Sequence, residues 1–248
     1  TSPYLNDNIR IYSSKFVAEA SSGSLLAGPS GKGLVISDVE FVGFDTALLF
    51  GRVNNVTVKD SPNITLGKTG STEPCEIRGL TLDGCGADND SVFCYQNNLM
   101  VDGLLVYGAK CPAIFYTSGN DQSWSNVKLF NSTTGVTPYF AIRSTGTHAF
   151  KSIEQDGGAN TFKTHPDGAG AVVNIQGLTS TAGATITDDN ALTWNCSNFM
   201  ITRTGSSGTV FVQNNASSVV NYAGIGAISI AALSGGSAVG TVTNVLQA

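Results

Sequence analysis

Pairs of apolar residues two positions apart recur along this chain at an almost constant interval. The first members of successive pairs are Val56, Leu80, Leu104 and Val127, which lie 24, 24 and 23 residues apart. A fixed period of about 20 to 50 residues indicates a solenoid, in which each coil buries its apolar residues against the neighbouring coils.

A second set of short apolar runs shares this period. Its intervals are roughly 21 to 26 residues, and its members are 92–95, 113–116, 139–142, 161–162, 184–186 and 209–212. A β-sandwich, the alternative, has strands about every 8 to 12 residues and no reason for a shared longer period. Two parallel sets of strands therefore favour the solenoid.

The expected coil is built from short strands joined by corners of Gly, Asn, Ser or Thr. In the run 34–41 the apolar residues Ile36, Val39 and Phe41 break the alternation once, which predicts a corner between two strand halves. We therefore predict an all-β fold, a right-handed single-stranded parallel β-helix of roughly nine coils over residues 1–221. Residues 20–33 are expected to form a Gly/Ser-rich loop.

Residues 222–248 differ from the coils because they carry no charged side chain and alternate only weakly. So small and apolar a segment does not form a core of its own easily. We expect a non-repeating C-terminal β tail that caps the last coil or joins equivalent tails in an oligomer.

Charge and hydropathy exclude two classes of partner. Charged residues make up 12% of the chain and the net charge is −5, with no basic run that could neutralise phosphates. No apolar stretch reaches the 18 or so residues that a membrane-spanning helix needs. We expect neither nucleic acid nor membrane as a partner.

No metal, cofactor or catalytic motif stands out. The five cysteines are odd in number and irregularly spaced, so we expect buried free thiols, with a Cys75–Cys85 disulfide as the alternative. Residues 88–90 begin like a calcium loop but lack its later Gly and Glu, and are expected to form a turn. His148 and His165 are expected at the surface or at corners.

Four segments carry a family resemblance: 55–60 (NVTVKD), 78–84 (RGLTLDG), 102–108 (DGLLVYG) and 125–130 (SNVKLF). Their cadence resembles that of the right-handed parallel β-helix proteins of the pectate-lyase-like superfamily. Within it, the low charge and the apolar tail look most like bacteriophage tailspikes and other virion spike or decoration proteins. The resemblance covers about residues 8–215 and implies a homotrimer that contacts other virion proteins.

The residue after each inward pair is expected to point outward, which places Lys59, Asp83, Tyr107 and Phe130 in one column about 4.8 Å apart. Aromatic rings can stack on sugars and Asp83 can act as an acid or base, so this column is the candidate glycan-binding face. The alternative is an ordinary exposed column with a Lys–Asp neighbour pair. The clustered acids or the basic catalytic residue that lyases of this superfamily use are not found at matching positions.

These features predict a structural virion surface protein: a phage spike, tailspike or capsid decoration, assembled in the host cytoplasm and exposed outside the cell. Its role would be particle stability or attachment to a host surface polysaccharide. The alternative is a polysaccharide depolymerase of tailspike type, either a glycoside hydrolase or a lyase. No cofactor is expected in either case.

Overall fold

The structure is a computed structural model of the 248-residue chain. It describes residues 10–18, 24–26, 35–68, 71, 74–86, 92–110, 113–117, 119–130, 139–156, 162–164, 166–180, 186–188, 190–201, 211–213, 219–223 and 230–232.

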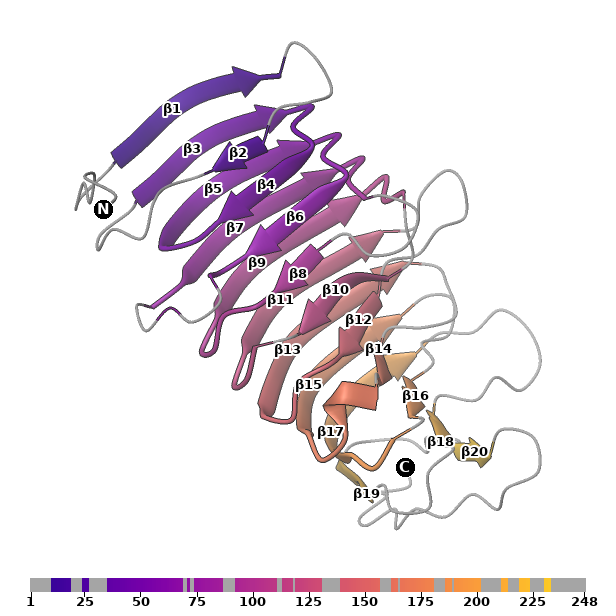
Figure 1. Ribbon diagram of the computed structural model, residues 1–248. Helices are drawn as coiled ribbons and strands as arrows, with labels where there is room; N and C mark the ends of the chain where they lie inside the picture. Colours follow the sequence, from indigo (N-terminus) through magenta and orange to yellow (C-terminus); the bar gives the residue numbers. More distant parts are fainter. Residues whose placement is uncertain are drawn as a thin grey trace.

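Two parallel sheets of ten strands each make up the fold, one from the odd-numbered and one from the even-numbered strands (Figure 1). The first, here the long sheet, contains β1 (Arg10–Val17), β3 (Val35–Val42), β5 (Arg52–Lys59), β7 (Glu76–Asp83), β9 (Met100–Tyr107), β11 (Ser123–Phe130), β13 (Thr147–Asp156), β15 (Val172–Ser180), β17 (Thr193–Ile201) and β19 (Val219–Ala223). The second, the short sheet, contains β2 (Ser24–Leu26), β4 (Thr46–Leu49), β6 (Asn63–Leu66), β8 (Val92–Cys94), β10 (Ala113–Thr117), β12 (Tyr139–Ile142), β14 (Phe162–Thr164), β16 (Ile186–Asp188), β18 (Phe211–Gln213) and β20 (Ile230–Ala232). A 3-10 turn, η1 (Pro166–Gly168), precedes β15.

The chain passes alternately from one sheet to the other, so each pair of consecutive strands forms one coil of a parallel β-solenoid. Leu80 lies opposite Leu104, and Leu104 lies opposite Val127, in neighbouring strands of the long sheet. The all-β solenoid predicted from the period is therefore confirmed. Strands β19 and β20 continue both sheets beyond residue 221, and the capping or oligomerisation role of residues 222–248 stays a prediction.

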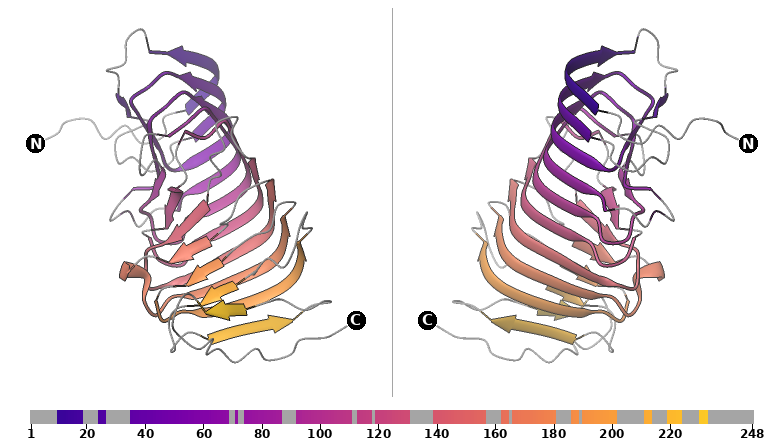
Figure 2. Two further views of the ribbon diagram at one scale, coloured as in Figure 1. Left: turned by 90° about the vertical axis from the view of Figure 1, so that its right-hand side faces the viewer. Right: turned by 90° about the vertical axis from the view of Figure 1, so that its left-hand side faces the viewer.

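A left-handed residue bends each of the first nine long strands (Figure 2). These residues lie in one column across the sheet, with φ between 45° and 80°: Ser13, Asp38, Asn55, Gly79, Gly103, Asn126, Ser152, Gly177 and Asn198. Gly, and to a lesser degree Asn and Asp, adopt this conformation at low cost, and together they fill seven of the nine positions. In β3 the bend at Asp38 lets Ile36, Val39 and Phe41 all point inward, which confirms the predicted corner.

The interior between the two sheets is filled mainly by apolar side chains. Large aromatic residues occupy the coils from β11 to β17, and edge-to-face pairs join the sheets. Trp124 of β11 packs on Phe140 of β12 with ring centroids 5.1 Å apart, and Phe162 of β14 contacts Trp194 of β17 at 6.4 Å. Such pairs add about 0.5–1.5 kcal/mol to the burial of the rings themselves.

Two expectations from the sequence are wrong. Ser24–Leu26 lies in the segment expected as a loop, but it pairs with β4 as strand β2. Of the two positions expected for His148, the surface is wrong: it lies at the start of β13, beside the corner that contains Ser144, and is fully buried, because the strand directs it into the core opposite Val173.

The prediction of buried free thiols is confirmed for the four cysteines that the structure describes. Cys75, Cys85, Cys94 and Cys196 are buried and free. Cys111, His165 and residues 88–90 lie outside the described residues.

Candidate functional site

Three residues of the predicted glycan column do lie side by side on the outer surface. Lys59, Asp83 and Tyr107 end strands β5, β7 and β9 and stand opposite one another in the register. Phe130 ends the next strand, β11, where it lies opposite Asp156 of β13. All four side chains are half-buried, and their contact with a glycan stays a prediction.

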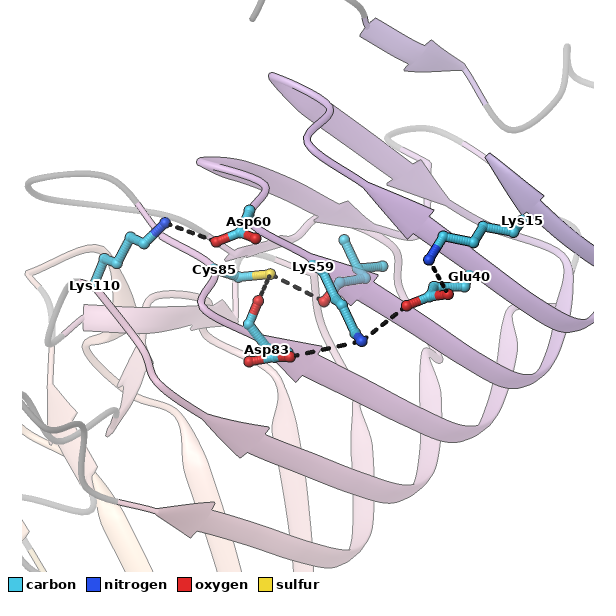
Figure 3. Close-up of polar contacts among 8 residues, drawn as sticks. Lys15, Glu40, Lys59, Asp60, Asp83, Cys85 and Lys110 are labelled. Carbon is cyan, nitrogen blue, oxygen red and sulfur yellow. Dashed lines mark hydrogen bonds and ion pairs between the residues drawn. The ribbon is translucent and has the colours of Figure 1, made fainter. Parts of the chain in front are cut away.

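Neighbouring side chains compensate the charges at this column (Figure 3). The Lys59 Nζ lies 2.8 Å from one oxygen of Glu40 and 4.0 Å from Asp83, and Lys15 Nζ lies 3.0 Å from the other Glu40 oxygen. The hydrogen bond from Lys59, and then that from Lys15, holds the pKa of Glu40 below its usual value. Lys15, Glu40, Lys59 and Asp83, here the ion-pair cluster, thus satisfy one another without a ligand.

Two groups beside the ion-pair cluster, Tyr107 and Cys85, have raised pKa values. Burial, followed by the charge of Asp83, raises the pKa of Tyr107. Burial also raises the pKa of Cys85 to about 11, and its Sγ lies 3.3 Å from the carbonyl oxygen of Val58 (Figure 3). A thiol with this pKa remains protonated and is a weak nucleophile.

A hollow lies on another part of the long sheet, away from the ion-pair cluster. It has a volume of about 720 Å³ and crosses β11, β13, β15 and β17 in their first halves, before their left-handed residues, and ends on β19. We call it the amide groove, and it is lined by Ser123, Trp124, Ser125, Ala149, Phe150, Lys151, Asn174, Ile175, Gln176, Asn195, Cys196, Ser197, Asn221 and Ala223. Trp124, Phe150 and Ile175 are buried, so the exposed lining consists mostly of short amide, hydroxyl and methyl side chains.

An asparagine ladder orders the far end of the amide groove. The Nδ2 of Asn195 donates to the Oδ1 of Asn174, and the Nδ2 of Asn221 donates to the Oδ1 of Asn195, both at 2.8 Å. Each such bond uses one of two amide hydrogens and one of two lone pairs of the carbonyl oxygen. The ladder therefore holds amide groups at the strand spacing along this end of the groove.

A smaller hollow continues the amide groove toward the N-terminal coils. It has a volume of about 220 Å³, is lined by residues of β7, β9 and β11, and shares Ser123 and Ser125 with the amide groove. Its lining is charged, with Glu76, Arg78 and Asp102. Hydrogen bonds from Ser125 and Asn126 hold the pKa of Asp102 below its usual value.

Together the two hollows extend from β7 to β19. That distance is six strand steps, or roughly 30 Å at the usual spacing of hydrogen-bonded strands. The amide groove was missed from the sequence because no motif marks it. The sequence pattern that could have revealed the groove is a change, from coil to coil, from charged to mostly neutral residues at the outward positions. This change is visible only after the strands have been aligned with one another.

A buried serine–histidine pair has the distance of a catalytic dyad but not the access. The Oγ of Ser144 lies 2.9 Å from the Nε2 of His148 and donates to the carbonyl oxygen of Gly119 at 2.8 Å. Ser144 is 6% exposed and His148 is fully buried. A nucleophile must reach its substrate, so this pair serves the packing of the corner between β12 and β13.

The comparisons with known proteins assign no family. No protein-family model, no curated protein and no solved structure matches the chain. In the described part of the chain, no group of three or more His, Cys, Asp or Glu residues is placed to hold a metal ion, and no helix has the length and hydropathy needed to cross a membrane.

Proposed function

We propose that this protein is a structural surface protein that attaches to a polysaccharide through the amide groove, in the manner of a virion spike. The observation that carries the proposal is the hollow of about 720 Å³ across β11–β19 with its hydroxyl and amide lining. Sugars present many hydroxyl groups, and each hydroxyl both donates and accepts hydrogen bonds, as the Asn, Gln and Ser side chains of the groove do.

The shape of the groove favours a chain over a compact ligand. Its polar side chains recur once per strand, so a linear polymer lying across the strands would meet similar groups at each step. A parallel solenoid also changes shape little on binding, since each strand is hydrogen-bonded along its length to its neighbours. A preformed groove reduces the entropy lost on binding.

Attachment is favoured over cleavage by the lining of the amide groove. A glycosidase needs a pair of carboxyl groups at the bond it cleaves, and the described residues that line the amide groove include no Asp or Glu. In the alternative, a polysaccharide depolymerase, Asp83 would act as the acid or base, and Asp83 lies outside the groove.

The test is to incubate the purified chain with capsular polysaccharides and lipopolysaccharides of candidate bacterial hosts. We expect retention of a polysaccharide with no new reducing ends and no absorbance from unsaturated sugars. Release of oligosaccharides that the Asp83→Asn variant abolishes would establish the depolymerase instead.

A further inference from the structure

One charged side chain stands in the neutral lining of the amide groove. Among the described residues that line it, Lys151 of β13 is the single charged one, and it is exposed. In the register Lys151 lies between Ser125 of β11 and Gln176 of β15, neither of which is charged.

The surroundings leave the Lys151 ammonium group available to a ligand. None of the ion pairs in the described part of the chain includes Lys151. The next acid along its own strand, Glu154, lies beyond the left-handed residue Ser152 and pairs with Lys128 at 2.9 Å. Asp102, on the same face, lies two strands away and is held by Ser125 and Asn126.

We propose that Lys151 determines specificity by binding an acidic group on an otherwise neutral, linear polysaccharide. This inference rests on the proposed function and names the class of glycan. The neighbouring Ser, Asn and Gln side chains would bind sugar hydroxyls, while the Lys151 ammonium group would pair with a carboxylate at one fixed position along the chain.

Two other classes of glycan fit the charges less well. A polymer with an acidic group on every sugar would place several negative charges where the amide groove has one cation, and would extend toward the smaller hollow, where Glu76 and Asp102 outnumber Arg78. An uncharged polymer would cover the Lys151 ammonium group without a counter-charge, which costs desolvation energy.

An array of bacterial capsular and O-polysaccharides of known repeat structure tests the inference. The array contains uncharged, sparsely acidic and densely acidic polymers, and each acidic polymer is also presented after reduction of its carboxyl groups. The proteins compared are the full chain and its Lys151→Gln, Lys151→Arg and Lys128→Gln variants. Lys128 is an exposed lysine on the second half of β11, outside the groove, and provides the matched control.

We expect the tightest binding to sparsely acidic polymers. Lys151→Gln should weaken it about tenfold, the usual effect of losing one charge-assisted hydrogen bond. Lys151→Arg should retain most of the affinity, and Lys128→Gln should bind as the unsubstituted protein does. After reduction of the carboxyl groups of the glycan, the unsubstituted protein and Lys151→Gln should bind it with equal affinity.

Two results would overturn the inference while leaving the proposed function standing: uncharged or densely acidic polymers as the tightest ligands, or unchanged affinity in Lys151→Gln. Retention of no polysaccharide of any class would overturn the proposed function, and the inference with it.

Discussion

At the scale of single residues, the left-handed column decides how each coil turns. Three of its nine positions are glycine, and the others are Asn, Asp or Ser. Side-chain hydrogen bonds support some of the non-glycine positions. The Nδ2 of Asn55 donates to the carboxylate of Asp38 at 2.7 Å, and that of Asn126 donates to Asp102 at the same distance.

Gly103 provides a test of this column, because its φ is +75° and an added Cβ would lie no closer than 3.4 Å to the backbone of Gly79. We expect Gly103→Ala to lower the free energy of unfolding by about 1–2 kcal/mol, the cost of a left-handed alanine. Gly103→Asn, which adds the same Cβ, should cost less, because asparagine tolerates this conformation. Urea unfolding measures both, and equal losses would contradict the role assigned to the backbone.

His148 should make the stability depend on pH. Burial lowers the pKa of His148 from its ordinary 6.5, so the unfolded chain binds a proton more readily than the folded one. Stability is therefore expected to fall as pH drops below about 6.5 and to stop falling, for this residue, once the pH is below the folded-state pKa.

The matched variant is His148→Gln, which can keep a hydrogen bond to Ser144 but does not titrate. We expect its free energy of unfolding to fall less steeply than that of the unsubstituted protein below pH 6.5. Parallel pH profiles for the two proteins would show that His148 does not cause the loss.

At the scale of strands, the period near 24 placed most strands of both sheets. Leu80, Leu104 and Val127 could be assigned to one column because each coil repeats the same pair of inward residues. Strand β2 could not be predicted, since three residues within a Gly/Ser-rich segment show no alternation. The burial of His148 was also missed, because its hydrogen bond to Ser144 depends on the fold of the corner.

The candidate site was less predictable than the fold. The stack of Lys59, Asp83 and Tyr107 follows from the repeat alone, but the pairing of Lys59 with Glu40 depends on side-chain conformation. The amide groove depends on the joint size of side chains from five strands, which no single segment reveals.

The ion-pair cluster should contribute little to stability and nothing to polysaccharide binding. Lys59 and Glu40 are partly exposed, and solvent screens such pairs. We expect Lys59→Gln to leave the unfolding midpoint nearly unchanged and to bind polysaccharide like the unsubstituted protein. If this variant lost polysaccharide binding but kept its stability, the binding site would be the column of Lys59, Asp83 and Tyr107.

At the scale of the whole molecule, the stacked strands form an elongated body with β1 at one end and β19 and β20 at the other (Figures 1 and 2). Tyr12, Phe16 and Val17 of β1 are 50%, 38% and 56% exposed in the single chain. Exposed terminal strands tend to pair with other chains unless they are covered.

A homotrimer stays a prediction from the family resemblance, and its measurement is light scattering coupled to size exclusion. The chain mass is 25.6 kDa, so three copies should give roughly three times that mass. A mass of one chain at micromolar concentration would contradict the trimer.

The central claim is that the amide groove binds polysaccharide, and filling the groove tests it most directly. Ala149 is an exposed residue of the groove on β13, so Ala149→Trp should block the hollow without disturbing the core. Thr179→Trp places the same side chain on the second half of β15, outside the groove, as the control. With equilibrium binding to a retained host polysaccharide as the measurement, we predict loss of at least tenfold in affinity for Ala149→Trp and none for Thr179→Trp. Equal affinity of the two folded variants would contradict the claim.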